Sequence, residues 1–212
     1  MATAAIGFVD SAKAITISYV SNPLNGSHIH FQGGGGPNAH TFTFVPTTND
    51  FTLTSGTCAG CVGEITGTFT IGTVTPIPGG AMAPVTGTGT LVIHDGFGNN
   101  LTASLTWVDI TQIGTSGTLD IGGALNLTGI TYSGINPDLR ALAHAGSASD
   151  TLDFTFNPAV SLFVLRNGGQ HNTSFSGTVT AQTPDGGASV ALLGIALAGV
   201  GGLRRIFRAR KT

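Results

Sequence analysis

Short runs in which apolar and polar residues alternate restrict most of this chain to β structure. Ala14 to Val20 reads Ala-Ile-Thr-Ile-Ser-Tyr-Val, and His40 to Val45 repeats the pattern. Alternation of this kind puts one face of a strand in a core and the other in solvent. Further runs are Phe51 to Thr54, Glu64 to Ile71, Thr86 to His94, Asn100 to Asp109, Asn126 to Tyr132, Thr151 to Phe156 and Thr173 to Thr180. Many short strands with hairpin-length turns predict an all-β body, an antiparallel β-sandwich or jelly roll, over residues 15–182.

One short helix is predicted within this body, near residues 136–145. Asn136 can cap it, Pro137 suits its first turn and Gly146 is placed to end it. The stretch from Thr73 to Pro84 is rich in proline and glycine, and we expect it to be the longest irregular connection. The recurring Thr-Gly-Thr triplets follow no fixed period, so a repeat architecture is not indicated.

The composition of the body argues against several function classes. Charged residues make up 8% of the chain and hydrophobic residues 41%, which fits neither a charged disordered chain nor a typical cytosolic enzyme. Residues 1–183 carry nine acidic and three basic side chains. Nucleic acid is therefore not an expected partner, because the body has no basic patch. We also find no phosphate-binding loop, dinucleotide fingerprint or Gly-x-Ser-x-Gly motif.

The last thirty residues have a different character. Ala188 to Leu203 carries no charge, and its sixteen residues would span about 24 Å as a helix, against ~30 Å for a bilayer core. A basic segment, 204–212, follows, with Arg204, Arg205, Arg208, Arg210 and Lys211. We predict a separate transmembrane helix over 188–203, because snorkelling arginines can extend a short span. The basic end would stay cytoplasmic and the body outside. The alternative, a buried helix of a soluble domain, should show a polar stripe that this run lacks.

A turn precedes that apolar run. It reads Thr183-Pro184-Asp185-Gly186-Gly187. Together the turn, the apolar helix and the basic cluster resemble the PEP-CTERM class of bacterial C-terminal sorting signals. The variant most similar to this tail has the motif Val-Pro-Asp-Ser-Gly, so Thr183 replaces its valine and Gly186 its serine. The resemblance is confined to residues 183–211.

This resemblance implies a route and a set of partners. The tail would hold an exported protein in inner-membrane lipid until an exosortase-type transpeptidase cuts near the motif and passes the body to the cell surface. Proteins of this class are associated with exopolysaccharide and biofilm matrix, which makes exopolysaccharide a further expected partner. We therefore expect a structural protein of the envelope or matrix that is not an enzyme and has no cofactor.

Two other functions remain open. A carbohydrate-binding module on the same scaffold would need an exposed aromatic platform, and Tyr19, Trp107 and Tyr132 are all the Trp and Tyr available. A hydrolase or metal-dependent enzyme would need a pocket in which histidine and aspartate side chains converge.

The first fourteen residues have two interpretations. Ala2 to Val9 is weakly apolar, and Ala12-Lys13-Ala14 has the small-x-small form of a signal-peptidase site, although no basic segment precedes it. Residues 1–14 are thus either the remnant of a signal peptide whose true start lies upstream, or an irregular lead into the first strand.

Cys58 and Cys61 form a single Cys-x-x-Cys motif. A zinc site would need two further ligands, and a thioredoxin-type site needs a helix beginning at the first cysteine, which the local sequence does not offer. In an exported protein we favour a disulfide that closes a glycine-rich loop over free thiols, metal or redox chemistry.

Other side chains of chemical interest are scattered. His28 and His30 share one face of an expected strand and, with His40, resemble the first half of a cupin metal motif without its glutamate. His94, Asp95 and His171 could join them, but surface histidines are the simpler interpretation, and no metal is expected. Asp150 and Asp153 are the candidate carboxylate pair for glycoside chemistry.

Overall fold

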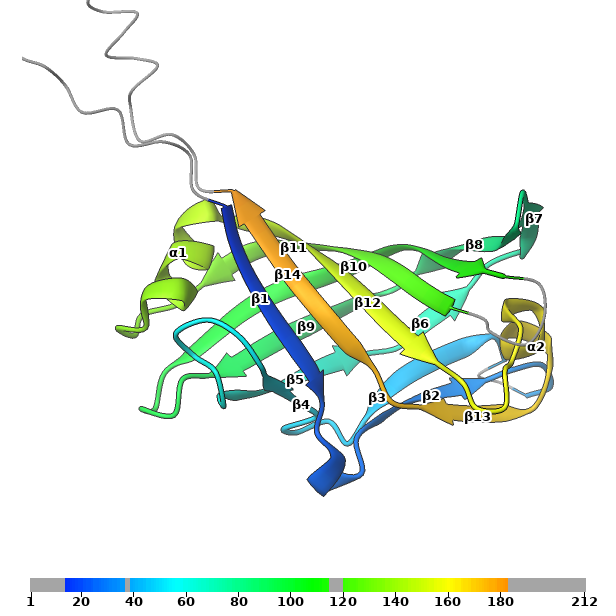
Figure 1. The fold of residues 1–212 in the computed structure, drawn as a ribbon, viewed down its shortest axis with the longest axis horizontal. Helices are drawn as coiled ribbons and strands as arrows, with labels where there is room; N and C mark the ends of the chain where they lie inside the picture. The colour runs from blue at the N-terminus through cyan, green and yellow to red at the C-terminus, as the bar shows by residue number, and fades with distance from the viewer. Residues whose placement is uncertain (1–13, 37–38, 115–119, 183–212) are drawn as a thin grey trace, which may run out of the picture. The chain divides into compact units, whose positions relative to one another are not determined.

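Hydrogen-bonded pairing joins every strand of the described residues into one sheet (Figure 1). The structure, a computed structural model, describes residues 14–36, 39–114 and 120–182. Residues Ala14–Gln182 make one compact unit. The predicted signal-peptide remnant, except Ala14, and the whole C-terminal tail from 183 lie outside the described residues.

In the part of the chain that the structure describes, fourteen strands, all paired antiparallel, form the sheet. They are β1 (Ala14–Ser21), β2 (His28–Gln32), β3 (Thr41–Val45), β4 (Phe51–Leu53), β5 (Val62–Gly67), β6 (Phe69–Ile71), β7 (Thr75–Ile77), β8 (Gly80–Thr86), β9 (Thr88–His94), β10 (Asn100–Ile113), β11 (Asp120–Thr131), β12 (Ser147–Thr155), β13 (Gln170–Thr173) and β14 (Ser176–Gln182). The helices are α1 (Pro137–Ala145), α2 (Leu162–Asn167) and the 3-10 turn η1 (Pro23–Asn25).

Eight of these strands close into a barrel. The pairing runs β10–β11–β12–β14–β1–β4–β5–β9 and returns to β10. Beyond an irregularity in its register near Trp107, β10 also pairs with β8. A second row of paired strands, β8–β6–β3–β2–β13, begins at this point, and we call it the branch. The prediction of an all-β, antiparallel body is confirmed. The sheet closes on itself, however, where a sandwich or jelly roll would keep two separate sheets.

Aromatic side chains fill the space between the branch and the barrel wall. Phe31 of β2 lies 5.5 Å from Phe154 of β12 between ring centroids, and Phe42 of β3 lies 4.9 Å from Trp107 of β10. Each of these four side chains is buried. The branch therefore contacts the barrel through buried aromatic rings, whose apolar surface helps to stabilise the fold.

Glycines sit beneath several of the large core rings. Gly177 of β14 is paired with Tyr19 of β1, and a Cβ at Gly177 would overlap the tyrosine ring. A Cβ at Gly123 would likewise overlap the ring of Trp107, and one at Gly63 would overlap the ring of Phe51. The missing side chain lets a ring lie flat on the neighbouring strand, which explains why glycine occurs inside strands that it would otherwise weaken.

Two of the Thr-Gly-Thr triplets, at 66–68 and 86–88, are corners where the chain passes between barrel and branch. Gly67 (φ 137°) is the last residue of β5, and Gly87 (φ 127°) separates β8 from β9. Both φ values lie in a region that side chains with a Cβ rarely adopt. The corners lie side by side, because β5 pairs with β9 on one side of them and β6 with β8 on the other.

The predicted helix is present as α1. Asn136 caps its first turn, Gly146 (φ 72°) ends it, and Leu139 and Leu142 are buried against the barrel. In Figure 1, α1 lies at one end of the barrel and α2 at the other. The prediction that Thr73 to Pro84 is irregular is wrong, because β7 and most of β8 form there, with Pro76 on the outermost strand.

No helix among residues 14–36, 39–114 and 120–182 has the length and apolarity needed to cross a membrane. The span predicted for 188–203 lies outside the described residues.

Candidate functional site

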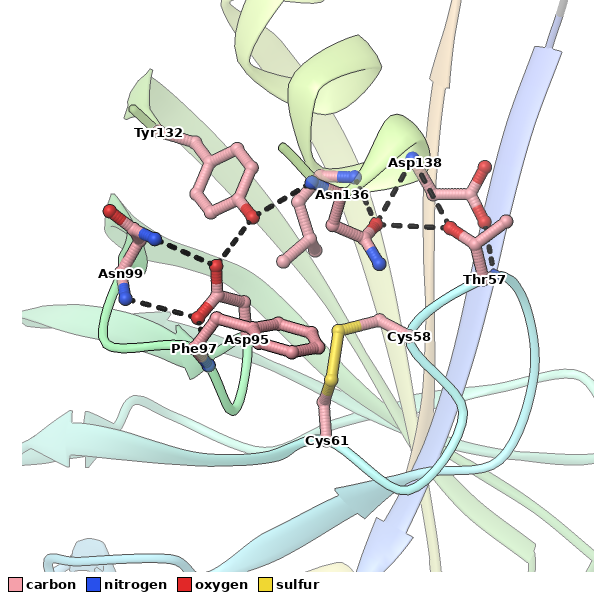
Figure 2. Close-up of a disulfide and its surroundings, with 10 residues drawn as sticks. Thr57, Cys58, Cys61, Asp95, Phe97, Asn99, Tyr132, Asn136 and Asp138 are labelled. Carbon is pink, nitrogen blue, oxygen red and sulfur yellow. Dashed lines mark hydrogen bonds between the residues drawn. A yellow bond between two sulfur atoms is a disulfide. The ribbon is translucent and has the colours of Figure 1, made fainter. Parts of the chain in front are cut away.

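A disulfide marks the end of the barrel that carries α1 (Figure 2). Cys58 and Cys61 are bonded, with their Cα atoms 5.4 Å apart, in the loop between β4 and β5. The loop folds back on β4, because Leu53 donates its N–H to the carbonyl of Cys61 and Gly60 donates to that of Leu53, both over 2.8 Å. In the described ranges no three His, Cys, Asp or Glu side chains gather as metal ligands would.

The residue before the disulfide joins this loop to the start of α1. The N–H of Thr57 donates to Asp138 over 2.6 Å, and its hydroxyl donates to the side-chain oxygen of Asn136 over 3.0 Å. The same oxygen of Asn136 accepts from the N–H groups of Asp138 and Leu139 and so caps the helix. A helix N-terminus thus does lie beside the Cys-x-x-Cys motif, supplied from a distant part of the chain. It meets Thr57, however, and not the first cysteine.

A second network lies next to the helix start, around the buried carboxylate of Asp95. Asp95 accepts from the N–H groups of Phe97 and Asn99, from the Asn99 amide, and from the hydroxyl of Tyr132 over 2.8 Å. Burial would raise the pKa of Asp95, but these hydrogen bonds outweigh it and hold the pKa at about 2. The Tyr132 oxygen also accepts from the N–H of Asn136 over 3.1 Å. The hairpin at 95–99, Tyr132 and α1 are therefore tied together, as Figure 2 shows.

An open hollow of about 570 Å³ lies beside Tyr132. The segment 130–135 lines one side, and Arg140, Ala143 and His144 of α1 line the other. Burial and the bond to Asp95 raise the pKa of Tyr132, while the nearby positive charge of Arg140 acts to lower it.

The histidines singled out in the sequence do not converge. His28 and His30 lie on the outer face of β2, where His30 bonds to Asn172 over 2.7 Å. His40 bonds to the carbonyl of Arg166, and His94 pairs with Glu64 over 2.8 Å on another part of the barrel. His171 lies on β13 against Phe156. Each has a local structural partner, so the cupin-like hypothesis gains no support.

Asp150 and Asp153 point to opposite faces of β12. Asp150 faces inward, 1% exposed, and accepts the hydroxyl of Tyr19 over 2.6 Å, while Asp153 is exposed. They cannot flank one glycosidic bond, so the hypothesis of a carboxylate pair is wrong. The alternation in Asp150-Thr-Leu152-Asp-Phe154 already puts Asp150 on the face of the apolar residues. That signal would have predicted its burial.

A third buried carboxylate, that of Asp50, was not predicted. Asp50 has no exposed surface, and one of its oxygens accepts the N–H of Ile65 over 3.0 Å. Burial raises its pKa to about 8. Asp50 precedes Phe51, and neighbouring residues in a strand normally face opposite ways, so no periodic signal marks Asp50 as buried.

Comparison with known proteins concerns the tail. A family model, the VPDSG-CTERM motif, matches residues 184–207. No curated protein and no solved structure matches the chain. The predicted resemblance to the VPDSG variant of the sorting signal is thus confirmed over this segment. A C-terminal signal of this kind indicates an exported protein that is sorted to the cell surface.

Proposed function

We propose that this chain is an exported protein that its tail holds in the inner membrane. An exosortase-type transpeptidase would process it near residues 183–187. The released body would then serve as a structural protein of the envelope or biofilm matrix. The single observation that carries the proposal is the VPDSG-CTERM match over residues 184–207. The body would itself be non-catalytic. Its partners would be the transpeptidase, inner-membrane lipid and exopolysaccharide.

The body has features that support a displayed structural role. Its sheet closes on itself through eight strands, which leaves few unpaired strand edges to aggregate. A disulfide closes one loop, as suits an oxidising environment outside the cytoplasm. The residues that could have suggested catalysis, Asp150 with Asp153 and the histidines, lie apart among the described residues.

A carbohydrate-binding module is the second candidate, and one observation favours it. Tyr19 and Trp107 are buried in the core, so neither can form an aromatic platform. Tyr132 differs, because it is only partly buried and lines the hollow beside α1. A single aromatic wall next to polar groups is a common arrangement in small-ligand sites.

Cell fractionation with mass spectrometry of the mature C-terminus tests the sorting proposal. An epitope-tagged chain, expressed in its native host, should reach the cell surface with a C-terminus near residues 183–187 and without Arg204 to Lys211. A Pro184→Ala/Asp185→Ala double variant should be exported but stay unprocessed in the membrane. Thr183→Val, which restores the variant's own motif, is the matched control and should be processed normally.

Two results would contradict the proposal. One is an intact C-terminus on mature, membrane-held protein in a host that has an exosortase. The other is normal processing of the double variant, which would mean that the motif is not what the enzyme recognises.

A further inference from the structure

The hollow beside α1 contains a cation that has no hydrogen-bond or ion-pair partner among the described residues. Arg140 and Arg166 are the only Lys or Arg among the described residues. Arg166 bonds to Asn167, whereas the guanidinium of Arg140 makes no hydrogen bond or ion pair with any described residue. In an acidic body with so few basic groups, an unpaired arginine in a concave site marks a place where a negative charge would be stabilised.

His144 adds a second nitrogen group to the same side of the hollow. It follows Arg140 by four residues, so the two side chains are neighbours on one face of α1. Both line the hollow and both are exposed.

The opposite wall carries a tyrosine ring that is held in place. Tyr132 donates its hydroxyl to Asp95 and accepts from Asn136, so its ring orientation is fixed before any ligand arrives. Gly134 packs so closely that a Cβ there would overlap the phenol oxygen. Ile135 is 77% exposed at the same wall. A fixed ring with an exposed aliphatic neighbour suits the C–H groups on one face of a saturated ring ligand.

The orientation of α1 is also fixed, by the disulfide loop. Thr57 binds both Asn136 and Asp138 at the first turn, and Arg140 follows only two residues later. The disulfide next to Thr57 limits how far the loop can move. The loop thus positions the arginine opposite the tyrosine.

We propose that this hollow binds an acidic sugar, the uronic-acid residue of a polysaccharide, with its carboxylate on Arg140 and its ring against Tyr132. The guanidinium matches a carboxylate with two parallel N–H donors. About 570 Å³ is the size of an ordinary small-molecule site and has room for more than a bare anion. The proposal rests on the proposed function only for the source of the sugar, a matrix polysaccharide at the cell surface.

Isothermal titration calorimetry on the full chain in a neutral detergent tests this site. The ligands are a short uronic-acid oligosaccharide, the same oligosaccharide with its carboxyl groups reduced to alcohols, and inorganic phosphate. We expect measurable binding of the first alone. Arg140→Gln should weaken it about tenfold to a hundredfold, the usual effect of losing a charged hydrogen-bond partner. Arg140→Lys keeps the positive charge but loses the two parallel N–H donors, so its affinity should lie between those of the unaltered chain and Arg140→Gln.

Arg166→Gln is the matched control, because it removes the other described arginine from the far end of the body. It should bind like the unaltered chain. Since the basic tail is present in every variant, its attraction for acidic sugars cancels in the comparison. An equal loss in both variants, equal binding of the carboxyl-reduced oligosaccharide, or equal binding of phosphate would overturn the proposal. None of these outcomes bears on sorting, which the fractionation experiment tests separately.

Discussion

Inside the barrel, the hydroxyl of Tyr19 donates to a carboxylate oxygen of Asp150 over 2.6 Å, and both side chains are withdrawn from solvent. The other oxygen of Asp150 has no hydrogen-bond partner among the described residues, and the same is true of one oxygen of Asp50. Burial raises the pKa of Asp150 to about 7, against the opposing effect of the Tyr19 hydrogen bond. Two acids that hold their protons near neutral pH make the stability of this body depend on pH in an uncommon direction.

We predict that the body is more stable in mild acid than in mild base. With folded-state pKa values of about 7 for Asp150 and about 8 for Asp50, the folded chain holds protons that the unfolded chain releases above pH ~4. This stabilisation is complete below pH ~4 and is lost as the pH rises through the folded-state values. The free energy of unfolding, measured in urea, should fall by several kcal/mol from pH 5 to pH 8.

Two variants isolate the contribution of Asp150. Asp150→Asn can still accept the hydroxyl of Tyr19 but no longer titrates, so its stability should change less between pH 5 and pH 8. Asp153→Asn is the control, because Asp153 is exposed on the same strand, and it should retain the full pH dependence. Identical pH profiles for both variants and the unaltered chain would rule out Asp150 as a source.

Gly177→Ala should destabilise the body sharply. The new methyl group would overlap the ring of Tyr19, and overpacking of a core of this kind costs about 1–3 kcal/mol or more. Gly169→Ala is the control, since a Cβ there meets nothing within 4 Å. Thermal unfolding should show a lower Tm for the first variant and little change for the second. Similar Tm values would mean that the ring can move aside at no cost.

Removing the disulfide should have a modest and local effect. The bridge closes a loop of four residues, for which the chain-entropy estimate is about 2 kcal/mol. A Cys58→Ser/Cys61→Ser variant should therefore remain folded, with faster amide hydrogen exchange in residues 54–61 and in the first turn of α1. Unfolding of the whole body would show that the bridge supports more than this loop.

Asn136→Ala should lower the free energy of unfolding by about 1–2 kcal/mol, which is at the upper end for helix caps. The side-chain oxygen of Asn136 accepts hydrogen bonds from two helix N–H groups and from the hydroxyl of Thr57. Asn136→Asp keeps the oxygen and should lose much less. Ser161→Ala offers a comparison, since Ser161 makes one such bond to a six-residue helix. Equal losses for the two alanine variants, measured by urea denaturation, would mean that the contact with Thr57 adds nothing.

Elements that are specified by neighbouring residues could be predicted from the sequence, whereas the pairing of distant strands could not. α1 follows from Asn136, Pro137 and Gly146, which act within one helix. Barrel closure depends on β1 meeting β14 and on β5 meeting β9, and alternation tells which face of a strand is buried but not which strand lies beside it. The prolines and glycines of β7 and β8 suggested an irregular loop, because these residues are uncommon in central strands. They are tolerated here because the two strands lie at or near an edge of the sheet.

The candidate site divides in the same way. The Cys58–Cys61 pair could be inferred from its spacing and an exported setting. The contact between Thr57 and Asp138, 81 residues apart, could not, because it exists only once the barrel has brought the loop and the helix together. Arg140 was counted in the sequence as one of few basic residues, but only the fold shows that it faces Tyr132 across a hollow.

The pairing of β14 with β1 and β12 sets an order of events. Ala14 is opposite Gln182, so β1, the first strand of the body, can complete its pairing only when β14, the last strand, is present. In a chain that is exported from its N-terminus, we expect the gap between β1 and β12 to stay open until residues 176–182 have crossed. The sorting motif follows directly behind them, so an enzyme that cuts at this motif, as proposed above, would meet it only on chains that already have every strand of the body. Surface display would thereby be limited to complete molecules, without a separate quality check.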